Sequence, residues 1–195
     1  TMNCCLFDVG SVLRGGFEMG NVWYNEPKTL DTAFDVMGDI ILSTAAQQYG
    51  GFTVPEVDKI LSPYAQKSYN KYYEEFLKYS DPSWEGREEK GRVYAWEKVC
   101  RDCDQGWQGI EYKLNTVGSS RGDYPFVTVT LGLGTGQFEK MCNISLLEVH
   151  KGGQGKAGHK KPVLFPKIVF LYDENLHGPG KPCEDIFEEG VDCSS

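Results

Sequence analysis

Apolar residues recur every three or four positions along three long stretches of the chain, and this spacing predicts three amphipathic helices. The first helix covers residues 28–49, the second 55–79 and the third about 88–117. Pro27 suits the first turn of the first helix, and Gly50 suits its end. In the third stretch the apolar positions form a narrow seam, which is typical of a helix that packs against another helix.

Shorter apolar and β-branched runs predict three strands, at residues 2–7, 125–131 and 163–172. A fourth helix, at about 137–150, separates the last two strands, so these elements form a βαβ unit with parallel strands. Because the strands are apolar throughout, we expect burial on both faces, with a missing partner covering the open edge of so small a sheet. The polar tail, 173–195, is expected to be loosely structured.

Composition and charge narrow the class of protein. The 195 residues suit one α/β domain, and the net charge of −8 with a pI near 4.9 argues against a nucleic-acid binder. No run approaches the roughly 18 apolar residues of a membrane helix, and the first residues do not resemble a signal peptide. Seven scattered cysteines indicate reduced thiols in a cytoplasmic protein.

A glycine-rich loop and two lysines are candidate anion sites. Gly132, Gly134 and Gly136 lie between a predicted strand and a helix, where backbone N–H groups can approach a phosphate. The third glycine stands one position too early for the dinucleotide fingerprint, and a tight turn without any ligand explains the loop equally well. Lys28 and Lys71 could hold a phosphate or could simply be solvated.

The cysteines allow different interpretations. Cys4 and Cys5 are neighbours on a predicted strand, so they point to opposite faces and only one can face a given cavity. Cys100 and Cys103 have CxxC spacing, but they fall within a helix on its apolar seam, which favours core packing over redox chemistry. No second ligand pair with suitable spacing follows them, so no metal site is expected.

Short motifs in order along nearly the whole chain resemble the anaerobic, glycyl-radical ribonucleoside-triphosphate reductases. The motifs are Asn3-Cys4-Cys5-Leu6-Phe7-Asp8, Gly16-Phe17-Glu18-Met19-Gly20-Asn21, Glu26-Pro27-Lys28, Tyr49-Gly50-Gly51, Ser68-Tyr69-Asn70-Lys71, Leu114-Asn115-Thr116, Pro125-Phe126-Val127-Thr128, Gly132-Leu133-Gly134-Thr135 and Phe165-Pro166-Lys167-Ile168-Val169-Phe170. A single tetrapeptide would mean little, but the ordered set is specific.

The resemblance implies half of a ten-stranded α/β barrel, with flanking helices at about 28–79 that form a dimer interface and bind a deoxynucleotide effector. In this family a C-terminal glycyl radical passes to a cysteine on a finger loop, which takes a hydrogen from the ribose, and formate is the overall reductant. A second cysteine, on the first barrel strand, donates a hydrogen. Cys4 matches this second cysteine, and Cys5 would then pack under the helices.

The same resemblance assigns further sites and partners. Substrate contacts are expected at Asn3, Asn115, Ser119, Gly132, Gly134 and Thr135, and effector contacts at Lys28, Asp39, Lys71 and Asn25. The partners implied are nucleoside triphosphates, a second copy of the chain and a radical-SAM activating enzyme, with no nucleic acid and no membrane.

The finger-loop cysteine motif, the glycyl-radical segment, the zinc site and the ATP-binding cone of the family have no counterpart in these residues. We therefore expect a fragment that holds no cofactor of its own and is inactive alone. The alternatives are a stand-alone dNTP-binding dimerisation module and a structural remnant without catalysis.

Overall fold

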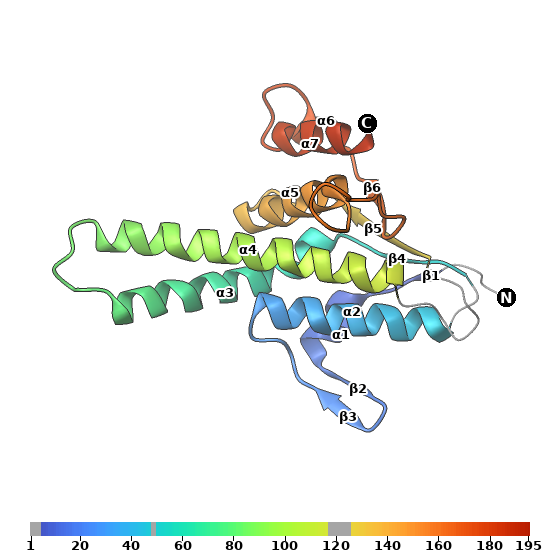
Figure 1. The fold of residues 1–195 in the computed structure, drawn as a ribbon, viewed down its shortest axis with the longest axis horizontal. Coiled ribbons are helices and arrows are strands. Elements are labelled where there is room, and N and C mark those ends of the chain that lie inside the picture. The colour runs from blue at the N-terminus through green and yellow to red at the C-terminus, as the bar shows by residue number, and fades with distance from the viewer. Residues whose placement is uncertain (1–4, 48–49, 117–125) are drawn as a thin grey trace.

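A parallel four-stranded sheet with helices packed on one face forms the body of the molecule (Figure 1). The computed structural model describes residues 5–47, 50–116 and 126–195. The sheet order is β1-β4-β5-β6, with all neighbours parallel. The strands are β1 (Cys5–Leu6), β4 (Phe52–Val54), β5 (Val127–Leu131) and β6 (Lys167–Phe170). A separate antiparallel hairpin consists of β2 (Phe17–Met19) and β3 (Val22–Tyr24).

Helices make up most of the chain, and the four long ones lie where the apolar spacing predicts them. Two of them, α3 and α4, run side by side and extend beyond the sheet as an arm (Figure 1). The helices are α1 (Val9–Gly15), α2 (Leu30–Gln47), α3 (Val57–Tyr79), α4 (Arg87–Thr116), α5 (Gln137–Gly152), α6 (Glu174–His177) and α7 (Glu184–Ser194).

The two faces of the sheet differ, contrary to the prediction that both are buried. Phe52 and Val127 pair across β4 and β5, and both are buried in the core with the helices. On the opposite face the described residues leave a row open, in which Leu6 is 73% exposed and Lys167 is also exposed. The register places one residue from each strand in this row, namely Leu6, Thr53, Thr128 and Lys167.

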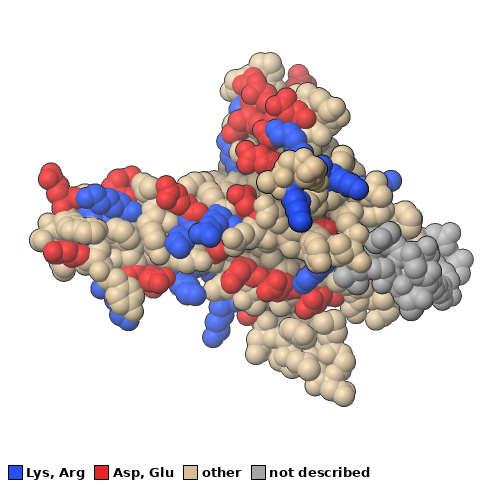
Figure 2. Space-filling view, viewed as in Figure 1, with Lys and Arg blue, Asp and Glu red and all other residues tan. Residues whose placement is uncertain are grey.

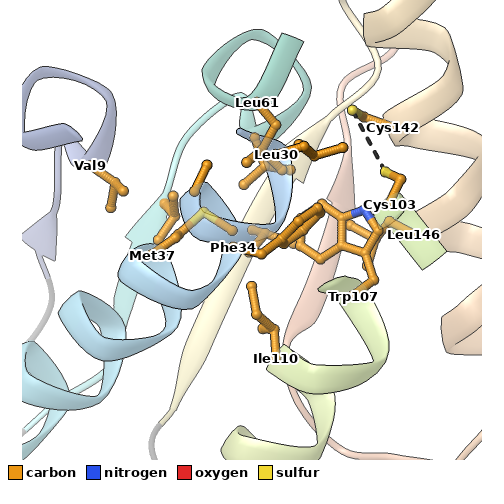
Figure 3. Close-up of a cluster of buried hydrophobic side chains, with 14 of the residues drawn as sticks. Val9, Leu30, Phe34, Met37, Leu61, Cys103, Trp107, Ile110, Cys142 and Leu146 are labelled. Atoms are coloured by element: carbon orange, nitrogen blue, oxygen red, sulfur yellow. Dashed lines mark hydrogen bonds between the residues drawn. The ribbon is translucent and has the colours of Figure 1, made fainter. Parts of the chain in front are cut away.

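The centre of the core lies where α2, α4 and α5 meet (Figure 3). The ring of Phe34 on α2 packs edge-on against fully buried Trp107 on α4, with 5.0 Å between ring centroids. Gly106, next to Trp107, lets the two helices approach closely, because a Cβ there would lie 2.1 Å from the Phe34 ring. This contact fixes the distance between α2 and α4.

The apolar face of α2 is buried within the chain itself. The apolar positions of α2, including Phe34 and Met37, are buried in the chain's own core, where α4 supplies Trp107 and Ile110. Exposed apolar side chains lie on the open sheet face, on the β2–β3 hairpin, where Trp23 is 59% exposed, and on α3 and α4, where Tyr79 and Tyr112 are exposed. The hairpin protrudes below the body and carries little charge (Figure 2).

The tail differs from its prediction, since it forms α6 and α7 rather than a loose segment. Two apolar residues, Cys183 and Ile186, are fully buried against Leu147 of α5 and anchor it. Three further elements do not follow from the pattern: α1, the hairpin and β4. Within the described part of the chain, no helix combines the length and apolar character that a membrane span requires.

The Phe34 contact generates the first prediction. Gly106→Ala should lower the free energy of unfolding by about 1–3 kcal/mol, because the new methyl group overlaps the Phe34 ring. Gly109→Ala is the matched control on the same helix, because nothing lies within 4 Å of the place its new methyl group would take, and it should stabilise by about 0.5–1 kcal/mol. Urea unfolding followed by circular dichroism measures both, and equal effects would contradict the packing described.

Candidate functional site

The carboxyl edge of the parallel sheet is where ligands collect in open α/β folds, and here a carboxylate follows each strand. Asp8 accepts from Ser11 N at 3.0 Å at the start of α1, and hydrogen bonds from Ser11 lower the pKa of Asp8. Glu56 stands at the start of α3 and pairs with Lys59 at 2.7 Å. The other two carboxylates are Glu139, after β5, and Asp173, after β6.

The glycine loop after β5 is held by these acidic groups rather than open to an anion. Gly134 N donates to Asp58 Oδ2 at 2.9 Å, and Gly136 N donates to Glu139 Oε2 at 2.8 Å. Gly134 is buried, and a Cβ there would lie 2.6 Å from Asp58 Oδ2. The N–H groups of Gly134 and Gly136 therefore already have carboxylate acceptors within the chain, while Thr135 is exposed, and a phosphate contact at this loop stays a prediction.

Asp58 is the centre of a buried polar network. It lies in the first turn of α3 and is fully buried, and its Oδ2 also accepts from Asn143 Nδ2 at 3.1 Å. The remaining oxygens, Oδ1 of Asp58 and Oδ1 of Asn143, are buried without a hydrogen-bond partner among the described residues. One carboxylate thus joins α3, the glycine loop and α5.

A buried histidine holds the same loop from the other side. His177 on α6 donates from Nε2 to Gly132 O at 2.7 Å, and its Nδ1 accepts from Asp173 N at 2.9 Å. Because a carbonyl oxygen can only accept a hydrogen bond, the contact with Gly132 O places a proton on Nε2. Gly132 has φ +117°, and a Cβ there would lie 3.0 Å from Leu171 O, so the loop needs glycine at this position.

Asn115 has a structural role instead of the expected substrate contact. Its Nδ2 donates to Glu111 O and Phe165 O, both at 2.7 Å. Its Oδ1 accepts from Leu164 N at 3.1 Å and Phe165 N at 3.2 Å. The amide is saturated, and it fastens the segment before β6 to the end of α4. Asn3, Cys4 and Ser119 lie outside the described residues.

Lys28 and Lys71 are exposed, and each lies close in sequence to one end of a hydrogen bond between α2 and α3. In that contact Leu30 N, at the start of α2, donates to Ser68 Oγ at 2.8 Å. Lys28 lies two residues before Leu30, and Lys71 lies about one turn after Ser68. The structure therefore brings both lysines to one region of a single chain, beside the N-terminus of a helix.

Asp39 lies apart from Lys28 along the chain, and Asn25 makes a local hydrogen bond. Asp39 lies nine residues after Leu30 on α2, about 13 Å along the helix. It forms an ion pair with Lys113 of α4 at 3.4 Å. Asn25 Oδ1 accepts from Trp23 Nε1 at 3.0 Å, so that oxygen already has a partner. Across residues 5–47, 50–116 and 126–195, no three His, Cys, Asp or Glu side chains are grouped to hold a metal ion.

Comparison with known proteins gives the family. The family model for anaerobic ribonucleoside-triphosphate reductase matches residues 1–195. The chain belongs to the anaerobic ribonucleoside-triphosphate reductase family. Reductases of that name from Haemophilus influenzae and Escherichia coli are 37% and 35% identical to it over 194 residues, and that of enterobacteria phage T4 is 36% identical over 195.

These matches cover 99% of this chain but only 26% of the two bacterial relatives and 31% of the phage one. The chain therefore spans between a quarter and a third of the length of these reductases.

Sequence reasoning missed Asp58, Asn143 and His177, because an acidic residue in a first helical turn and a histidine in a polar tail usually face water. The one signal in the sequence was the glycine loop itself, because closely spaced glycines indicate that other groups pack tightly against the backbone there.

The second prediction concerns Asp58. Asp58→Ala should lower the free energy of unfolding by about 2–5 kcal/mol, because two buried donors lose their acceptor at about 1–3 kcal/mol each. Asp58→Asn should cost less, since it keeps an oxygen in place. Asp31→Ala is the matched control, an exposed acid in the first turn of α2, and should cost below about 1 kcal/mol. Chemical unfolding that ranked Asp31→Ala with Asp58→Ala would refute the network.

Proposed function

We propose that this chain forms part of the catalytic barrel of an anaerobic reductase that converts ribonucleoside triphosphates to deoxyribonucleotides with formate as reductant. The observation that carries the proposal is the open face of the four-stranded parallel sheet, in a chain that belongs to this family. Parallel sheets are covered on both faces in complete proteins. The remaining length of the relatives is sufficient to supply the second half of a ten-stranded α/β barrel.

The open face is also where the hydrogen-donating thiol belongs under this proposal. Leu6 lies on the open face, and residues two apart on a strand share a face. By this alternation we expect Cys4 to face the barrel interior and Cys5 to face the helices. The thiol of Cys4 would then supply a hydrogen to the ribose, with the glycyl radical, formate and the activating enzyme all provided from outside this chain.

The third prediction tests Cys4 in a chimera in which this chain replaces the matching segment of the phage T4 reductase. The chimera should form deoxynucleotides, and Cys4→Ser should reduce the rate by about a thousandfold or more, because serine cannot replace a thiol as hydrogen donor. Cys5→Ser is the matched control and should mainly lower stability. Loss of activity with Cys5→Ser but not Cys4→Ser would reverse the assignment. The 195-residue chain alone should give no product.

We further propose that the region of Lys28 and Lys71 contacts the phosphates of a dNTP effector. Both are exposed lysines that form no ion pair within the described part of the chain, and they flank the first turn of α2. A helix N-terminus and two ammonium groups together favour a polyphosphate. We also propose that the effector-bound form is a homodimer, in which this region of each chain lies at a regulatory interface with the second copy.

The fourth prediction measures dNTP binding by calorimetry, with molecular mass from light scattering. Lys28→Ala and Lys71→Ala should each weaken binding about tenfold to a hundredfold, as expected for one charge-assisted hydrogen bond. Lys78→Ala is the matched control, an exposed lysine two turns further along α3, and should leave the affinity unchanged. Equal losses for all three lysines would indicate unspecific attraction. Binding without turnover by the isolated chain would favour the stand-alone dNTP module.

A further inference from the structure

Two buried thiols face each other across the packing of α4 against α5 (Figure 3). Cys103 Sγ, on α4, lies 3.8 Å from Cys142 Sγ, on α5, and the two residues are 0% and 1% exposed. The residues are 39 positions apart in the chain, so their approach is a product of the fold. We propose that this pair is a latent redox site, at which slow oxidation by hydrogen peroxide forms a disulfide that links α4 to α5.

The chemistry balances with hydrogen peroxide as the oxidant. One sulfur attacks peroxide and becomes a sulfenic acid, with release of one water. The second thiol then displaces the hydroxyl of that sulfenic acid, the S–S bond forms and a second water leaves. Two thiols and one peroxide thus give one disulfide and two waters. The sulfurs close from 3.8 Å to about 2.05 Å, a movement of under about 1 Å for each.

The geometry selects this pair over the CxxC pair on α4. Cys100 and Cys103 lie three residues apart on one helix, so a bond between them would not link two elements of the fold. Cys103 instead donates its S–H to Cys142 from the opposing helix. That hydrogen bond and burial raise the pKa of the Cys142 thiol, and burial raises the pKa of Cys100 to about 11. The raised pKa of Cys142 and the burial of both thiols make oxidation of the pair slow and limit it to a small oxidant.

Formation of the disulfide would also change the position of the glycine loop at the carboxyl edge of the sheet. Cys142 is followed directly by Asn143, whose amide donates to Asp58 at 3.1 Å. The same Asp58 oxygen accepts from Gly134 N at 2.9 Å. A shift of α5 toward α4 therefore alters the hydrogen bond that positions the glycine loop, which couples the oxidation state of the core to the edge where ligands are expected.

The test maps the disulfide in the purified chain. The reduced protein is treated with hydrogen peroxide, its remaining thiols are alkylated under denaturing conditions, and it is digested with trypsin. We expect peptides 102–113 and 141–151 to be joined, with a mass two hydrogens below their sum, and dithiothreitol to separate them. The backbone amide signal of Gly134, followed by 15N–1H NMR, should shift on oxidation and return on reduction.

The controls separate this site from general thiol oxidation. Cys142→Ala and Cys103→Ala should each abolish the joined peptides and the Gly134 shift, while Cys100→Ser should preserve both. The wild-type peptide map requires no variant to fold. Alkylated Cys103 and Cys142 after prolonged peroxide treatment, or a Cys100–Cys103 bond in their place, would overturn the site. Joined peptides with an unmoved Gly134 signal would overturn its coupling to the loop.

Discussion

The buried carboxylate of Asp58 is the constraint on which the carboxyl edge of the sheet depends. It joins the start of α3, the loop after β5 and the side of α5 through two hydrogen bonds to a single oxygen. A buried charge is costly unless it is hydrogen-bonded, so each partner is required in place for the others to fold. The position of the glycine loop is therefore determined by α3 as much as by its own glycines.

At the same edge, carboxylates of the chain accept the backbone N–H groups of the turns. A helix N-terminus attracts negative charge, and here Asp8, Glu139 and Asp173 accept backbone N–H groups at the turns after β1, β5 and β6. Once a carboxylate satisfies such a turn, an incoming phosphate meets like charge and few available donors. Lys28 and Lys71, which form no ion pair among the described residues, lie elsewhere, beside the start of α2, so the proposed effector region and the glycine loop are different regions.

Much of the fold follows from local pattern, whereas most of the site does not. The four long helices were predictable because each buries an apolar stripe of helical period. Strand β4 has only three residues between a glycine pair and Pro55, and pairing on both sides makes it a strand. Asn115 could not be recognised as a clamp, because its partner Phe165 lies 50 residues away. Motif resemblance found the family, but it could not show which polar groups the fold already uses.

The composition of the open sheet face bears on what covers it. A layer of helices would require a continuous apolar surface, as on the opposite face with Val127, Val129 and Leu131. The open face instead carries threonines at 53, 128 and 130 and the exposed ammonium of Lys167 beside exposed Leu6 and Val169. Small hydroxyl side chains and one cation suit a wall that contacts polar groups and water. This pattern favours the lining of a cavity that holds a polar ligand over a second dry core.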